Sequence, residues 1–138
     1  MLSLFYFITS YYMRSLNKVL LIGNLTKDPE MIDLDSGIKM AKFSLATNHG
    51  WKAKDGEKKQ MTDFHNVIVW RKLAELAQQY LKKGAAVLVE GKLHNNKFQD
   101  KEGKNKTVTE VHADEINFIT YKKNADIDEI NLVSVEAN

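Results

Sequence analysis

Residues 62–93 read TDFHNVIVW, then RKLAELAQQYLKKG, then AAVLVEGKL, and this stretch decides the fold. Residues 62–70 have the β-branched and aromatic content of a strand. Apolar side chains then recur at helical spacing over residues 73–81. The Lys-Lys-Gly of residues 82–84 predicts a basic last turn and a glycine just beyond the helix. Residues 85–93 alternate again, so the stretch predicts strand, helix, strand.

Further strands lie on both sides of this stretch. Residues 17–23, Asn-Lys-Val-Leu-Leu-Ile-Gly, predict a buried strand that ends at the glycine, and residues 39–48 alternate between two faces. Residues 50–61 are polar, with Asp55-Gly56 at the centre, which predicts a flexible hairpin loop. A second long hairpin is predicted around residues 101–103, and its return strand over residues 107–119. The order is three strands, one helix and two strands.

One inserted helix cannot supply the alternation of strands and helices that a parallel α/β sheet needs. The order instead predicts an all-β fold with one inserted helix, namely an OB-fold, a five-stranded Greek-key barrel with long hairpin loops. Barrels of this kind bind oligonucleotides across one face and its loops. Three aromatic residues in apolar periodic contexts are predicted to lie in the core: Phe43, Tyr80 and Phe118.

The composition of the 138 residues fits one domain, with 43% hydrophobic and 28% charged residues. Cysteine is absent, which excludes disulfides, thiolate nucleophiles and cysteine zinc sites. The net charge is +2, but residues 124–138 hold four acids and no Lys or Arg, so residues 1–123 carry 20 basic and 14 acidic groups. The chain is thus a mildly basic domain with an acidic tail.

We therefore expect three parts: an extension outside the fold (1–13), the OB-fold domain (14–121) and a short acidic disordered tail (122–138). The apolar start is too short to span a bilayer and lacks a secretory cleavage site. Met13 is the favoured functional start, which makes residues 1–12 an upstream extension; an organelle leader is the alternative. No membrane association is expected.

Four large aromatic residues have polar or charged neighbours: Trp51, Phe64, Trp70 and Phe98. By alternation, Phe64 and Trp70 share one face of their strand, and the opposite face carries Val67 and Val69. An aromatic residue in a strand usually packs in a core or a subunit interface. A ring exposed beside lysines can instead stack with unpaired bases, at roughly 1–3 kcal/mol for each base. The residues alone leave both interpretations open.

Basic residues show the same ambiguity, because a run of lysines usually only solubilises a loop. In the functional interpretation several lysines follow a phosphate backbone, and the affinity then falls with salt at a log–log slope of about −0.7 for each phosphate neutralised. These candidates are Lys54, Lys72, Lys83, Lys92, Lys97 and Lys106.

Two other functional classes remain as alternatives. An enzyme is disfavoured, because the four histidines show no metal-ligand spacing and no phosphate loop or nucleophile motif is present. We expect no catalytic residues, no metal and no cofactor. An interaction module with the same barrel, such as a primosome component or an RNA-binding domain without general wrapping of single strands, would not need four stacking rings.

Residues 14–119 also resemble the bacterial and mitochondrial single-stranded DNA-binding protein family. The resemblance rests on a series of short motifs in order: Asn17-Lys18-Val19, Gly23-Asn24-Leu25, Asp28-Pro29-Glu30, Phe64-His65-Asn66-Val67, Lys72-Leu73-Ala74-Glu75, Tyr80-Leu81-Lys82-Lys83-Gly84, Val89-Glu90-Gly91-Lys92-Leu93 and Thr109-Glu110-Val111. It implies an OB-fold homotetramer that binds single-stranded DNA with little sequence preference, during replication, recombination and repair, without catalysis.

By position, the resemblance makes the four aromatic residues base-stacking rings, adds Arg14 and Lys18 to the basic residues near the DNA, and gives His65 a role in subunit contacts. Asn66, His94 and Asn96 stand where the family often has arginine, which implies weaker binding or a shallower salt dependence. The acidic tip with a terminal Pro-Phe that recruits repair enzymes in bacterial members is not in this sequence, so replication and repair proteins are only possible partners. We expect a cytoplasmic protein of the bacterial nucleoid rather than a mitochondrial one.

Overall fold

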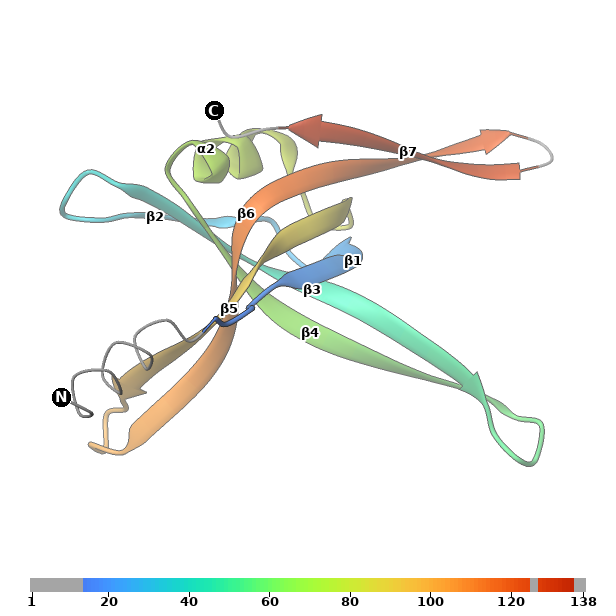
Figure 1. The fold of residues 1–138 in the computed structure, drawn as a ribbon, viewed down its shortest axis with the longest axis horizontal. Coiled ribbons are helices and arrows are strands. Elements are labelled where there is room, and N and C mark those ends of the chain that lie inside the picture. Colours follow the sequence, from blue (N-terminus) through green and yellow to red (C-terminus); the bar gives the residue numbers. More distant parts are fainter. Residues whose placement is uncertain (1–13, 125–126, 136–138) are drawn as a thin grey trace, which may run out of the picture.

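The computed structural model describes residues 14–124 and 127–135, with side-chain surroundings through Ile119. This part of the chain forms strands of very different length, with one helix between β4 and β5 (Figure 1). The elements are β1 (Val19–Leu25), β2 (Glu30–Asp33), β3 (Lys39–Lys52), β4 (Lys58–Trp70), α2 (Arg71–Tyr80), β5 (Ala86–Gln99), β6 (Asn105–Asn124) and β7 (Ile127–Val135). The predicted extension 1–13 lies outside the described residues.

Five of the strands close into a barrel. The strand β1 pairs antiparallel with both β3 and β5, and the antiparallel pairs β3–β4 and β5–β6 continue from them. A short parallel pairing of β4 with β6, at Val67↔Val111 and Ile68↔His112, completes the ring. Because α2 lies between the third and fourth strands of this ring, the predicted OB-fold with one inserted helix is confirmed.

Alternating residues of these strands fill the barrel. Val67, Val69, Val87 and Val89 have no exposed surface, and α2 adds Leu73, Ala74 and Ala77 to the same core. Phe43 is 5% exposed, as predicted. Tyr80 is not in the core, since it is 55% exposed and touches Phe118 only edge-on, with ring centroids 6.0 Å apart. Tyr80 is the last residue of α2, and its ring lies away from the buried face of the helix, which carries Leu73, Ala74 and Ala77.

Both predicted hairpins project from the barrel, in different directions (Figure 1). The first is more regular than the flexible loop predicted for residues 50–61, because the β3–β4 ladder runs on to Lys52↔Lys58. Only residues 53–57 form the turn, where Gly56 adopts φ 83° and Asp55 Oδ1 accepts a hydrogen bond from the Glu57 N–H at 3.0 Å. Cross-strand pairs of long side chains, such as His49 with Met61 and Trp51 with Lys59, extend the ladder.

The helix ends earlier than its sequence predicts. It stops at Tyr80, and the basic residues Lys82 and Lys83 lie beyond it rather than in its last turn. The side chain of Leu81 is 2% exposed, and its backbone is extended. Burial of this leucine in the core, together with a hydrogen bond from the Lys83 N–H to Asp28 Oδ1 at 2.7 Å, draws the chain out of the helical path.

Two strands lie outside the predicted set. The strand β2 pairs with β3 directly after Pro29, in a stretch for which no strand was predicted. The strand β7 pairs with β6 from Ile116↔Val135 to Asn124↔Ile127, so the structure differs from the disordered tail predicted for residues 122–138. Five of the nine residues of β7 are Ile, Leu or Val, which favour strands, and β6 runs past its pairing with β4 and offers an open edge.

Candidate nucleic-acid interface

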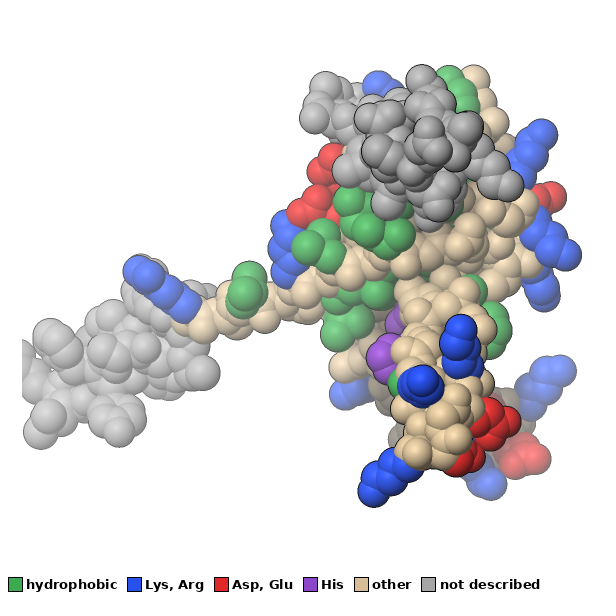
Figure 2. Space-filling view, turned by 90° about the vertical axis from the view of Figure 1, so that its right-hand side faces the viewer, with side chains coloured by type: hydrophobic (Ala, Val, Ile, Leu, Met, Phe, Trp, Pro, Cys, Tyr) green, Lys and Arg blue, Asp and Glu red, His purple; other side chains and the backbone are tan. Residues whose placement is uncertain are grey.

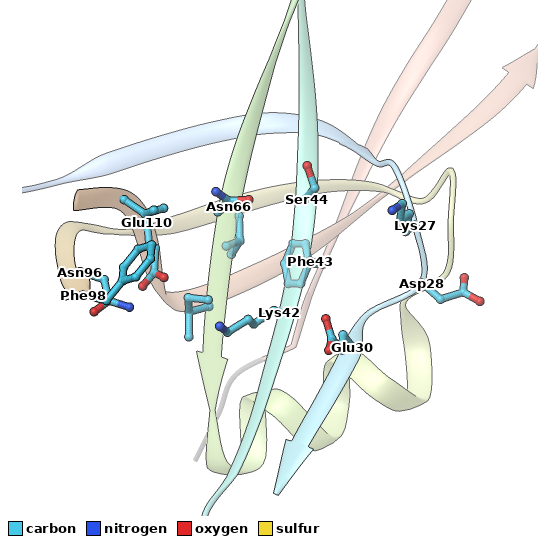
Figure 3. A pocket seen from close by; sticks show the side chains of 13 residues that line it. Lys27, Asp28, Glu30, Lys42, Phe43, Ser44, Asn66, Asn96, Phe98 and Glu110 are labelled. Carbon is cyan, nitrogen blue, oxygen red and sulfur yellow. The ribbon is translucent and has the colours of Figure 1, made fainter. Parts of the chain in front are cut away.

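A groove with a volume of about 530 Å³ crosses one face of the barrel (Figure 3). Its floor comes from β3 and β4, where Lys42, Ser44 and Asn66 point into it, and Ile68 is nearly buried. One wall is the segment around Lys27 that leads from β1 to β2, and the other is the β5–β6 hairpin. The groove thus lies between the two loop systems that flank the ligand face of an OB-fold.

Three of the predicted aromatic residues lie on this face. The register places Phe64 and Trp70 on the same side of β4 as Asn66, and Phe98 on β5 lines the groove. Their exposed fractions are 67%, 38% and 43%. Large aromatic side chains gain most when they are covered, so three rings left open around one groove indicate a surface that a flat partner covers.

Trp51 is set apart from the other three rings. Residues alternate along β3, so Trp51 and Ala46, the partner of Phe64 in the β3–β4 ladder, lie on opposite faces. Its ring is 43% exposed and stacks on His49, with centroids 5.8 Å apart. Trp51 lines a separate hollow with Lys52, Lys58 and Lys59 near the end of the hairpin. The structure therefore brings three of the four predicted rings together and leaves the fourth on a lysine-rich arm.

Two histidines, His94 on β5 and His112 on β6, lie beside Trp70 on the groove face. The ring centroids of His94 and His112 are 4.5 Å apart, and His112 meets Trp70 edge-on at 6.2 Å. His112 Nε2 also lies 3.2 Å from Glu110 Oε2, and the residue Glu110 is buried, with 9% of its surface exposed. Sequence reasoning missed His112 and Glu110 as site residues, because the register between β5 and β6 that brings them to His94 depends on a bulge at Glu90/Gly91.

The predicted basic residues divide into two groups. Lys92 and Lys106 share the groove face by register, since they lie opposite His112 and Phe98. Lys106 also pairs with Asp100 at 3.3 Å. The other six lie elsewhere: Arg14 before β1, Lys18 beside it, Lys54 in the β3–β4 turn, Lys72 in the first turn of α2, Lys83 after α2, and Lys97 on β5 facing away from Phe98.

Two lysines of the groove were not predicted. Lys42 and Lys27 line it from the β3 floor and from the segment after β1. Alternation along β3 places Lys42 opposite the core residue Phe43, and this signal in the sequence could have identified it. No local pattern marks Lys27, because its position depends on how the segment between β1 and β2 folds over β3.

Lys18 is already paired. Its ammonium contacts the Glu90 carboxylate, and this hydrogen bond and charge raise the pKa of Lys18 above its usual value. The charge of Lys18 is thus largely balanced within the chain.

Asp100 stabilises the turn of the β5–β6 hairpin, where the Lys104 and Glu102 N–H groups donate to its Oδ1 at 2.9 Å. These bonds, with the Lys104 N–H first and the Lys106 ammonium also contributing, lower the pKa of Asp100.

His65 lies on β4, and its side chain contacts one neighbour on β3. Its Nε2 lies 2.9 Å from the Thr47 hydroxyl across the β3–β4 ladder, and the residue is half-buried. The predicted role in subunit contacts stays a prediction.

Within residues 14–124 and 127–135 no group of three metal-ligating side chains comes together. In the same part of the chain no helix has the length and apolar character needed to cross a membrane.

A five-stranded barrel with its helix before the fourth strand, and an open groove bordered by exposed rings, defines an OB-fold protein built to receive an extended ligand. The comparisons with known proteins agree with this class. The model described as "Single-strand binding protein family" matches residues 16–119, and the chain belongs to this family.

Among its relatives are proteins from two strains of Neisseria meningitidis, serogroup A strain Z2491 and serogroup B strain MC58, each described as "Single-stranded DNA-binding protein". Each is 42% identical over 105 residues, which are 76% of this chain and 60% of the relative. The chain therefore spans less than two thirds of their length. A solved structure, "Plasmodium falciparum SSB complex with ssDNA", is 34% identical with a TM-score of 0.68, and the match covers 89% of this chain and 97% of that one.

Proposed function

We propose that this protein binds single-stranded DNA with little sequence preference and protects it during replication, recombination and repair, without catalysis. Bases stack on Phe64, Trp70 and Phe98 around the groove, and on Trp51 along the β3–β4 arm. Lysines of the groove and of the arm contact the phosphates. The observation that carries the proposal is a set of three exposed rings on one face, with Phe98 in the groove and Phe64 and Trp70 on the same side of β4 as Asn66. Their exposed fractions are 38–67%.

Stacking explains why these rings stay uncovered in the isolated chain. Each base that covers an aromatic ring contributes roughly 1–3 kcal/mol, and every base has a flat face, so the gain does not depend on sequence. The phosphates add a salt-dependent term through Lys27, Lys42 and Lys92. The family and the solved relative, whose title includes single-stranded DNA, support the same ligand. The bacterial relatives support a cytoplasmic location, and we extend this to the nucleoid.

The direct test is a titration of the protein with oligo-dT, followed by tryptophan fluorescence at several salt concentrations. We expect quenching as bases stack on Trp51 and Trp70. The affinity should fall with salt at a log–log slope of about −0.7 for each phosphate contacted. Lys42→Gln should make this slope shallower by about 0.7, because one groove phosphate loses its partner.

Lys39→Gln is the matched control, because Lys39 pairs with Glu75 of α2 at 3.5 Å and does not line the groove. It should leave the slope unchanged. Absence of binding to oligo-dT at low salt, or equal affinity for double-stranded DNA of the same length, would contradict the proposal.

We also propose that four copies of the chain assemble. The residues of β1 alternate, and while Val19 and Leu21 pack against the core, Leu20 and Ile22 are 60% and 59% exposed. Hydrophobic side chains are exposed at several places on the face shown in Figure 2. Adjacent exposed apolar side chains on a strand favour burial against another copy.

Light scattering on the wild-type protein tests the assembly. We expect a mass four times that of one chain at micromolar concentration, and a smaller mass for Ile22→Glu, because a carboxylate buried without a partner opposes association. Ile22→Val keeps the apolar surface and should keep the wild-type mass. A monomer mass for the wild-type protein would refute the assembly and leave the proposed DNA binding to its own test.

A further inference from the structure

Two imidazole rings lie against each other in the middle of the groove face. The centroids of His94 and His112 are 4.5 Å apart, and the rings are tilted by 36°. At this distance the charge of one ring acts directly on the other. Of the two, His94 is the exposed residue and His112 is half-buried. A ligand in the groove therefore meets the His94 side of the pair first.

The charged groups around the pair come from β5 and β6. Glu110 Oε2 contacts His112 Nε2 at 3.2 Å, and the register places Lys92 opposite His112 and Glu110 opposite His94. From β4 the neighbours of the pair are uncharged, namely Trp70 and Ile68. Two further acids of this part of β6, Asp114 and Glu115, interact with the Lys18 ammonium.

The charge of this cluster depends on protons. With both imidazoles neutral, Glu110 gives the cluster of Glu110, His94 and His112 a charge of about −1, which opposes a phosphate; one added proton brings it to about 0, and a second to about +1. His112 Nε2 faces the Glu110 carboxylate at 3.2 Å, whereas His94 is exposed, so a phosphate in the groove meets the His94 ring. A phosphate beside His94 would favour that second proton, because it supplies the anion that offsets the repulsion between two charged rings.

The position of His94 fits such a contact. Side chains alternate along β5, so Lys92, His94 and Phe98 share the groove face, and Trp70 borders His112 on the other side. A strand with one base on Trp70 and another on Phe98 passes over His94 between them. Its backbone carries a negative charge at every nucleotide.

We propose that His94, positioned by His112 and Glu110, is a proton-dependent phosphate contact within the groove. The inference rests on the proposed binding of single-stranded DNA. It means that the His94 imidazole takes up a proton as the strand binds, and that the affinity changes with pH in the range where imidazole titrates, between about pH 5 and 8.

Oligo-dT titrations at about pH 6 and about pH 8, each at two salt concentrations, test this inference. We expect wild-type affinity to rise toward low pH, by up to tenfold for each pH unit where one proton is linked. The salt slope should steepen by about 0.7 at the lower pH, because one more phosphate is neutralised. Calorimetry in two buffers of different ionisation enthalpy should show proton uptake on binding.

Substitutions of the histidine separate this contact from general effects of pH. His94→Gln should bind at low pH as weakly as the wild type binds at high pH. His94→Arg, which carries a permanent charge, should bind tightly at both pH values with no proton uptake. His49→Gln removes the histidine that stacks on Trp51 and should keep the full pH dependence.

The possible outcomes distinguish a failure of the His94 inference from a failure of the proposed DNA binding. Wild-type binding that does not change with pH, or a pH dependence that survives in His94→Gln or His94→Arg, overturns the inference while the proposed function stands. A pH dependence lost in His49→Gln instead assigns the proton to the hairpin arm and also overturns it. A wild-type protein that binds oligo-dT at neither pH refutes the proposed function itself.

Discussion

Trp70→Ala and Phe98→Ala are each expected to weaken binding of oligo-dT by roughly 1–3 kcal/mol, which corresponds to about 5- to 150-fold in affinity. Trp70 and Phe98 lie at the two sides of the histidine pair on the groove face, and they are 38% and 43% exposed. Because neither residue belongs to the buried core, truncation removes a stacking platform without opening a large cavity in the barrel. Equilibrium titration by fluorescence of the remaining tryptophan, or by anisotropy of labelled oligo-dT for both variants, measures the loss.

Tyr80→Ala is the matched control for ring removal. Tyr80 is 55% exposed, but it lies at the end of α2 and contacts Phe118, away from the groove. It should leave the affinity unchanged. The conservative variants Trp70→Phe and Phe98→Trp keep a flat ring and should retain most of the binding. If Trp70→Ala and Phe98→Ala, with unchanged circular dichroism, bound oligo-dT as the wild type does, the rings would not be stacking sites, and an interaction module would explain the barrel better.

The barrel could be predicted from the sequence because local patterns determine most of its strands. The alternation of Val67 with Val69 and of Val87 with Val89 gives the inward faces, and these four side chains are fully buried. The prediction of a hairpin turn at Asp55-Gly56 also rested on neighbouring residues alone. The exposure of Phe64 and Trp70 also followed from alternation along one strand without a bulge. Nothing beyond residues close in sequence was needed for these features.

The features that were missed depend on contacts between distant segments. The end of α2 depends on the burial of Leu81 and on Asp28, which lies 55 residues away from Lys83. The histidine pair joins two strands whose register shifts at a bulge, and neither histidine has a neighbour in sequence that marks it. Trp51 and Phe64 looked alike as polar-flanked rings, but the ladder between β3 and β4 puts them on opposite faces. Pairing register, unlike periodicity, cannot be read from one strand alone.

Gly91 is the position at which a single methyl group should do most damage to the fold. A Cβ built there would lie 2.2 Å from the His112 carbonyl oxygen and 2.8 Å from Ala113 Cα. Both are backbone atoms of β6, so no side chain can rotate away, and the two strands must separate at the bulge, where β6 carries the extra residue Asp114. We expect Gly91→Ala to lower the free energy of unfolding by about 3 kcal/mol or more, at the top of the range for overpacking.

Urea and thermal unfolding followed by circular dichroism measure this loss, and the midpoint temperature should fall by roughly 10 °C. Gly50→Ala is the matched control, because it also lies within a paired strand but its nearest atom would be the Lys59 carbonyl oxygen at an ordinary 3.7 Å. It should change stability by no more than about 0.5 kcal/mol. Since Gly91 precedes Lys92 and its partner Ala113 follows His112, surviving folded Gly91→Ala protein should also bind oligo-dT more weakly, with the histidine pair displaced. Wild-type stability in Gly91→Ala would show that β5 and β6 are not held as closely as the barrel requires.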